Sequence, residues 1–68
     1  MINQAPEFVS ISTIALLFDS SASNIRTVLA RLKDAGHRVD VLEWGGGHKP
    51  KINLAQFRKA VYAEYLKR

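Results

Sequence analysis

The residues best suited to chemistry gather in one short stretch, WGGGHKPKIN, which runs from Trp44 to Asn53. Three consecutive glycines would weaken the interior of a helix or strand, because glycine loses more conformational freedom on folding than any other residue. The stretch is therefore a loop or a place where the backbone approaches something closely. The bases His48, Lys49 and Lys51 follow the glycines directly, and clustered bases are typical of nucleic-acid binding.

The glycines have two other interpretations. A nucleotide-binding loop is not supported, because GGGHKPK lacks the spacing of the motif G-x-x-x-x-G-K-[ST]. A flexible hairpin turn accounts for Gly45, Gly46 and Gly47 equally well, but it leaves the adjacent bases unexplained. We therefore favour a functional role for the loop over a plain turn.

Catalytic and metal chemistry find no support in the residue types. The chain has no cysteine, only two histidines, and six acids scattered along its length. No Ser-His-Asp or paired-carboxylate arrangement can be argued, and a zinc site lacks its usual ligands. We expect no enzyme activity, no metal, no cofactor and no small-molecule substrate.

Length and composition predict one small folded domain over residues 1–68. The hydrophobic share is 47%, which is too high for a disordered chain. No apolar run approaches the roughly 20 residues that span a bilayer, so no membrane partner is expected. The start MINQAPEF has no basic segment typical of a signal peptide, and we expect a cytoplasmic protein.

Charge divides the chain into two unlike parts. Residues 1–25 hold two acids and no base, for a net charge of −2, whereas residues 26–68 hold ten bases and four acids, for a net charge of +6. A basic half favours a polyanionic partner. Ordinary solubilising charge is the alternative, so the distribution needs support from the elements that carry it.

The N-terminal part reads as an arm followed by a short helix. Residues 1–7 are expected to be a flexible arm, and FVSI is either a short strand or the entry to the helix. Residues 12–18 predict a helix that Ser12 caps. Its apolar residues Ile14, Leu17 and Phe18 fall on one face. The segment DSSAS then interrupts the helical pattern, because Asp and Ser favour turns and caps.

The clearest helix is SNIRTVLARLKDAG. Its apolar residues recur at the spacing of one helical face; they are Ile25, Val28, Leu29 and Leu32. Either Ser21 or Ser23 can cap its start. Gly36 stands where a left-handed residue would end it.

A hairpin and a closing helix complete the order. Val39 and Val41 alternate with polar residues, as in a strand. Pro50 cannot donate to a ladder, so the strand beside it should be short and at an edge. The last helix opens at Asn53, which forms a capping-box pattern with Gln56.

The closing helix carries two apolar stripes. The main stripe predicts its packed face and consists of Leu54, Phe57, Val61 and Tyr65. Phe8, Phe18, Phe57 and Tyr65 are expected in the core, and Trp44 is expected to pack against the closing helix. The second stripe, Tyr62 and Leu66, either widens the core face or contacts another protein; single exposed apolar residues need no explanation.

Two short helices joined by a tight turn, with the second amphipathic, are typical of a helix-turn-helix. Ala15 supplies the small residue that the crossing of the helices needs. Asp19 suits the turn, because Asp adopts left-handed dihedrals more readily than most residues. Ser20 stands where an aliphatic residue is more usual, and we expect it to loosen the turn.

At these residues the sequence resembles the excisionase and MerR-type winged-helix proteins. Ile14-Ala15, Ser21 and Ile25-Arg26 match the aliphatic-small pair, the helix cap and the aliphatic-arginine pair of their helix-turn-helix. VDVLEWGGGHKPKINLAQFRKAV resembles their wing and closing helix. The resemblance covers residues 9–66 and rests on pattern and order.

The resemblance implies a fold that is mainly α with a small β-hairpin, a winged helix-turn-helix that binds double-stranded DNA. In the excisionase branch it further implies a phage or mobile-element protein that bends DNA, directs an integrase or recombinase towards excision and often represses transcription. The glycines would then form the wing tip, where side chains would obstruct an approach to phosphate. His48, Lys49 and Lys51 would neutralise phosphates beside it.

The polar side of the second helix is the expected recognition surface. Arg can read guanine, and Ser, Thr and Asn can contact bases or phosphates. The predicted DNA contacts in this helix are Ser21, Ser23, Asn24, Arg26, Thr27 and Arg31. A merely solvated helix face is the alternative for any lone helix, and the surrounding element order favours recognition. Asp34 lies on the same side, near the end where the helix would leave the groove.

Two functions from different classes follow. The first is sequence-specific DNA binding by an excisionase or transcriptional regulator, with Tyr62 and Leu66 contacting an integrase or neighbouring copies on DNA. The alternative is a protein-interaction module that uses the same scaffold without touching DNA. Salt separates them, because phosphate binding weakens steeply with ionic strength.

Overall fold

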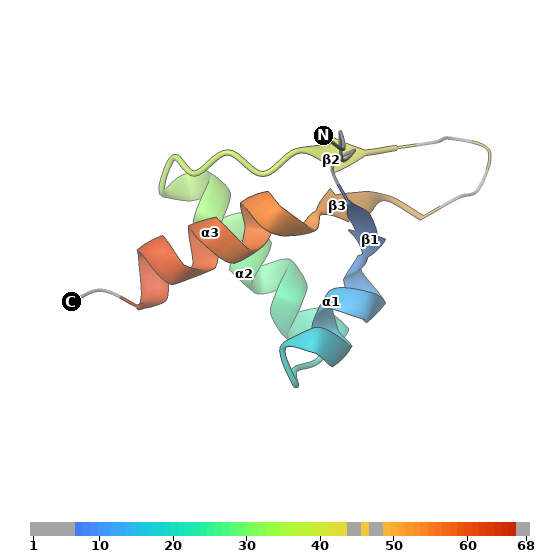
Figure 1. Ribbon diagram of the computed structural model, residues 1–68, viewed down its shortest axis with the longest axis horizontal. Coiled ribbons are helices and arrows are strands. Elements are labelled where there is room, and N and C mark those ends of the chain that lie inside the picture. The colour runs from blue at the N-terminus through green and yellow to red at the C-terminus, as the bar shows by residue number, and fades with distance from the viewer. Residues whose placement is uncertain (1–6, 44–45, 47–48, 67–68) are drawn as a thin grey trace, which may run out of the picture.

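The computed structural model describes residues 7–43, 46 and 49–66 (Figure 1). Helices account for most of the described residues and an antiparallel sheet for the rest, a layout compatible with a winged helix. The elements in chain order are β1 (Phe8–Ser10), α1 (Ile11–Leu17), α2 (Ala22–Asp34), β2 (Val41–Leu42), β3 (Lys51–Asn53) and α3 (Leu54–Tyr65). Of the predicted arm, only Glu7 is among the described residues.

The sheet has the strand order β1-β3-β2, with both neighbours antiparallel to β3. The stretch FVSI therefore contributes a strand, and the predicted two-stranded hairpin becomes part of a three-stranded sheet. The expectation that Pro50 confines its strand to an edge is wrong. Pro50 precedes the ladder, which begins at Lys51, so neither neighbour needs the N–H that proline lacks.

Helix α1 begins one residue earlier than expected, and its cap is Ser10 rather than Ser12. The Ser10 hydroxyl oxygen accepts from the Thr13 backbone N–H at 3.2 Å. Ser10 is still extended, as the last residue of β1, which is the backbone state that an N-cap requires. Leu17 points away from the core and is 55% exposed, so its predicted place on the packed face is also wrong.

The turn between α1 and α2 is short and tightly bonded. Asp19 has φ 53°, which confirms the predicted left-handed residue. The Ser20 N–H donates to the Ala15 carbonyl at 2.7 Å, and the Ser20 hydroxyl accepts from the Asn24 side-chain amide at 2.7 Å. Ser20 therefore fastens the turn to α2, contrary to the expectation that it loosens it.

Helix α2 has the predicted ends. Of the two candidate serines, Ser21 is the cap, since its hydroxyl accepts from the Asn24 N–H at 3.1 Å. Gly36 has φ +90° and ends the helix. The N–H groups of Gly36 and His37 donate to the carbonyls of Lys33 and Leu32, which is the bonding pattern of a Schellman motif.

Helix α3 is capped by Asn53, whose side chain accepts from the Gln56 N–H at 3.0 Å. The reciprocal half of the predicted capping box is absent, because the Asn53 N–H donates to the Asp40 carbonyl instead. The Gln56 side chain reaches Asp40 as well: Gln56 Oε1 accepts from the Asp40 N–H at 2.6 Å. The Asp40 N–H is thus bonded to a side chain of α3. Strand β2 comprises only Val41–Leu42 and is shorter than the strand predicted from the alternation that starts at Val39.

The core lies where the three helices meet the inner face of β3. Its buried members are Ile14, Ala15, Ile25, Leu32, Ile52, Leu54, Phe57 and Ala60. Ala15 is buried as the helix crossing predicts. Phe18 and Phe57 meet edge to face, with ring centroids 5.4 Å apart. Phe8 is only half-buried and Tyr65 is 49% exposed, so their predicted core positions are wrong.

Candidate functional site

The outward side of α2 presents a continuous polar surface. Of the six residues predicted to contact DNA from this segment, all are exposed: Ser21, Ser23, Asn24, Arg26, Thr27 and Arg31. A turn of 3.6 residues places Ser23, Thr27 and Ala30 along the middle, opposite the buried Ile25 and Leu32. Arg26 and Arg31 then lie on opposite flanks of that small-residue strip.

In the part of the chain that the structure describes, the two arginines of this surface have no acidic partners. Within the described residues, neither Arg26 nor Arg31 takes part in an ion pair, whereas Arg38 is held by Asp40 at 3.1 Å. Asp34, the acid on the same side, ends α2 and is exposed. The polar surface is therefore positively charged over most of its length, with one acid at its C-terminal limit.

Three of the predicted contact side chains already form hydrogen bonds within the protein. The Ser21 hydroxyl caps α2, and the Asn24 amide donates to Ser20. Thr27 donates its hydroxyl to the Ser23 carbonyl at 3.2 Å, within the helix. These bonds fix the side chains that carry them, so an approaching ligand would meet an ordered surface.

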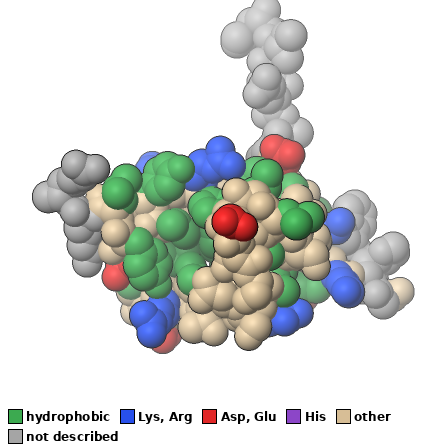
Figure 2. Space-filling model, turned by 90° about the horizontal axis from the view of Figure 1, so that it is seen from below, with side chains coloured by type: hydrophobic (Ala, Val, Ile, Leu, Met, Phe, Trp, Pro, Cys, Tyr) green, Lys and Arg blue, Asp and Glu red, His purple; other side chains and the backbone are tan. Residues whose placement is uncertain are grey.

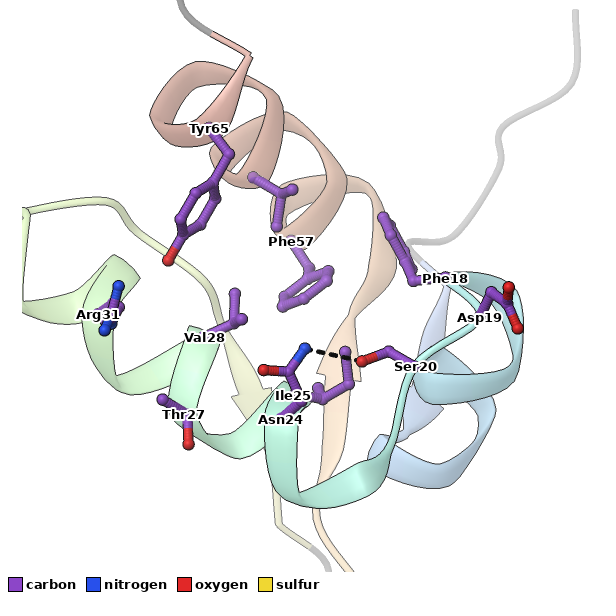
Figure 3. Close-up of a pocket in the computed structure, with 11 residues that line it drawn as sticks. Phe18, Asp19, Ser20, Asn24, Ile25, Thr27, Val28, Arg31, Phe57 and Tyr65 are labelled. Carbon is purple, nitrogen blue, oxygen red and sulfur yellow. Dashed lines mark hydrogen bonds between the residues drawn. The ribbon is translucent and has the colours of Figure 1, made fainter.

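Beside this surface runs a groove that the sequence did not predict. It lies between the α1–α2 turn and helices α2 and α3, has a volume of about 560 Å³, and is drawn in Figure 3. Its residues are Phe18, Asp19, Ser20, Asn24, Ile25, Thr27, Val28, Arg31, Phe57, Val61 and Tyr65. Asn24, Thr27 and Arg31 thus belong both to the predicted recognition face and to the wall of this groove.

Figure 2 shows hydrophobic side chains gathered on the face seen from below, on the side where α3 ends. Helix α3 itself carries an apolar stripe that is only partly covered. Phe57 is buried, but Val61 is only half-buried and Tyr65 is exposed by half. The stripe was interpreted as core from its spacing, and no sequence signal distinguishes a covered stripe from one that is partly open.

The hairpin residues are only partly described. Lys51 is half-buried in the central strand and pairs with Ser10 and Leu42. These three side chains share the sheet face opposite to that of Ile52, because side chains alternate along a strand. Lys51 therefore lies on the sheet rather than beside the loop tip. Lys49 is exposed.

Of the three glycines, only Gly46 is described, and it has φ +61°. Around the position of a Cβ on Gly46, no described atom outside its immediate neighbours lies within 4 Å. Its backbone conformation, and not crowding, is thus what favours glycine there. Gly45, Gly47 and His48, together with Trp44, lie outside the described residues.

The predicted protein-contact residues on α3 are well exposed. Tyr62 is 52% exposed and Leu66 is 55% exposed, so they do not widen the core face. Sequence reasoning gave no role to Leu16, which is 83% exposed at the end of α1.

Among residues 7–43, 46 and 49–66, no three His, Cys, Asp or Glu side chains lie close enough to hold a metal ion. No helix within those same ranges is long and apolar enough to cross a bilayer. Comparisons with protein-family models, curated proteins and solved structures give no match to this chain.

Proposed function

We propose that this protein binds double-stranded DNA as a winged helix-turn-helix domain, with α2 as its recognition helix. The observation that carries the proposal is the polar outer surface of α2, on which two arginines without acidic partners in the described chain flank a strip of small residues. The left-handed Asp19 and the buried Ala15 support the helix-turn-helix assignment. The resemblance to excisionase and MerR-type proteins points the same way.

The arrangement on α2 suits the major groove of B-DNA. That groove is about 12 Å wide and admits one helix, and small side chains along the middle of a helix allow it to approach the base edges closely. Ser23 and Thr27 would lie nearest to the bases. Arg26 and Arg31, on opposite flanks, would reach the two phosphate walls or a guanine at the rim.

The hairpin would add a second, sequence-independent contact. Lys49 and Lys51 both lie on or beside β3, and lysine binds phosphate as a compact charge. The glycine loop between β2 and β3 would let the backbone pass close to the duplex. Such contacts fix the position of a protein on DNA without reading its sequence.

In the cell, we propose the role of a phage or mobile-element excisionase, a transcriptional regulator, or both, acting at the nucleoid in the cytoplasm. A single winged domain covers only about 600–1,000 Å² of DNA-contacting surface, so several copies on neighbouring sites would bind more firmly. The exposed Tyr62 and Leu66 are the proposed contact with a neighbouring copy or with an integrase.

A second candidate is a protein-interaction module that does not touch DNA, favoured by those same exposed apolar residues of α3. An electrophoretic shift assay separates the two. DNA from the neighbourhood of the protein's own gene is titrated with the protein at about 50 mM and about 200 mM salt. DNA binding predicts a shift that weakens steeply, by orders of magnitude for a protein with several phosphate contacts. No shift at either salt concentration would favour the interaction module.

A further inference from the structure

The groove between α2 and α3 has an apolar floor that nothing in the described chain covers. Ile25 and Phe57 lie at its base and are almost fully buried. Val28 and Val61 also line the groove and are half-exposed. Tyr65 lies at one end of it (Figure 3). Water against such a surface is unfavourable in proportion to its apolar area, so a ligand with apolar groups would gain by covering it.

The length of the groove fits a short peptide segment. Phe57, Val61 and Tyr65 follow one another at intervals of four residues along α3, and a rise of 1.5 Å per residue makes this stripe about 12 Å long. That is about two turns of a helix. A helix that docks in a groove presents apolar side chains three and four residues apart, which matches the spacing of the floor.

The polar wall of the groove carries a charged donor, Arg31, that forms no ion pair with any residue in the described part of the chain. Ser20 and Asn24 are hydrogen-bonded to each other, and the Thr27 hydroxyl is bonded to Ser23. Arg31 and Tyr65 lie at the same end of the groove (Figure 3), and Arg31 has no ion pair among the residues described. An acidic side chain of a ligand could therefore pair with Arg31.

Phe18 closes the groove at the opposite end. Asp19 is the acid that lines the groove there, but its side chain points away from it (Figure 3). Among the described lining residues the base is Arg31, which complements an acidic segment and opposes a basic one.

We propose that this groove binds a short amphipathic segment of a partner protein, with apolar side chains on the floor and an acidic side chain paired with Arg31. The site goes beyond the proposed DNA binding and does not depend on it. A nucleic-acid strand would leave the apolar floor unmatched, which favours a protein ligand. A second copy of this chain is disfavoured, because each copy carries a net charge of +4 and the base Arg31 lines the groove.

The test uses the full chain, labelled with nitrogen-15, and no DNA. The probe is a synthetic helical peptide of about 14 residues with leucines three and four residues apart and one glutamate beside them. A second peptide carries lysine in place of that glutamate. Chemical-shift changes of backbone amides report the place of binding, and their titration reports the affinity.

The proposal predicts shifts at Val28, Val61 and Tyr65, with the glutamate peptide binding about threefold to tenfold more tightly than the lysine peptide. Arg31→Glu should reverse this preference. Tyr65→Ala should weaken binding about tenfold, whereas Tyr62→Ala, on the same helix but outside the groove, should leave it unchanged. Both tyrosines are about half-exposed, so both variants are expected to fold, which their spectra would verify.

Three outcomes would overturn the proposal. The first is shifts centred on Leu16 and Leu17, or none at all. The second is equal affinity for the two peptides, which would remove the role of Arg31. The third is shifts of the groove residues that depend on protein concentration without any peptide, because a second copy would then be the occupant. Since no DNA is present, these outcomes leave the proposed function untouched, and failure of DNA binding leaves the peptide test valid.

Discussion

Gln56 on α3 holds Asp40, the residue before β2, through two hydrogen bonds. Gln56 Oε1 accepts from the Asp40 N–H at 2.6 Å, and Gln56 Nε2 donates to Asp40 Oδ2 at 3.3 Å. The Asp40 carbonyl in turn accepts from the Asn53 N–H. The start of the hairpin is therefore fastened to the first turn of α3, and the position of the hairpin follows that of the helix.

Replacement of Gln56 with alanine tests this connection. The part-buried Asp40 N–H would lose its acceptor, which costs about 1–3 kcal/mol of the free energy of unfolding. Urea denaturation of the parent and the variant measures the difference. Lys59→Ala, an exposed change on the same helix, should remain within about 0.5 kcal/mol of the parent. Equal stability of the two variants would mean that water replaces the glutamine without loss.

Ser21 and Ser23 provide a matched pair of serines at the start of α2. Ser21→Ala removes the hydroxyl that caps the helix and should lower the free energy of unfolding by about 1 kcal/mol. Ser23→Ala should leave stability within about 0.5 kcal/mol, because Thr27 bonds the Ser23 backbone carbonyl and not its side chain. Thermal denaturation compares the two, and a larger loss for Ser23→Ala would contradict the cap assignment.

Asp19 offers a test of the turn. Its φ of 53° is strongly unfavourable for a β-branched residue, so Asp19→Val should destabilise the fold by about 1–2 kcal/mol. Asp19→Asn should be nearly neutral, since Asn also adopts this conformation readily. Chemical denaturation of both variants measures the contrast. Similar stabilities for valine and asparagine would show that the turn does not demand a left-handed residue.

The hairpin lysines are tested by their salt dependence. Each phosphate contact contributes about 0.9 to the slope of log K against log salt concentration. Replacing Lys49 and Lys51 together with alanine should therefore reduce the magnitude of that slope by about 1.8, for specific and non-specific DNA alike. Titration of the folded double variant across salt concentrations gives the slope. A slope equal to that of the parent would mean that the hairpin does not touch phosphate.

Features encoded by neighbouring residues were predictable from the sequence. The left-handed Asp19 and Gly36 and the cap at Asn53 were predicted correctly, because each depends on dihedral preferences or on hydrogen bonds within a few residues. The start of α1 was misplaced for a specific reason. Ser10 and Ser12 are equally good caps by type, and only the pairing of β1 with β3 makes Ser10 the extended one.

Features that join distant parts of the chain were not predictable. The capping-box pattern predicted the cap by Asn53 correctly. The Gln56 side chain, however, bonds to Asp40, sixteen residues earlier in the chain. Tyr65 continues the spacing of the buried Phe57, yet it is half-exposed because α2 does not cover that end of α3. The groove forms because α2 covers α3 incompletely. The extent of that cover depends on how the two helices cross and not on the sequence of either helix alone.

The affinities of three single variants for DNA test the proposal that α2 is the DNA-reading helix. Fluorescence anisotropy measures the binding of parent, Arg26→Ala, Arg31→Ala and Lys59→Ala to one target duplex at fixed salt. Lys59→Ala removes one positive charge from the exposed side of α3 and controls for net charge. Each arginine variant should lose about 1–3 kcal/mol of binding free energy, with stability unchanged, while Lys59→Ala should bind like the parent. If both arginine variants bind as tightly as the parent, α2 is not the recognition helix.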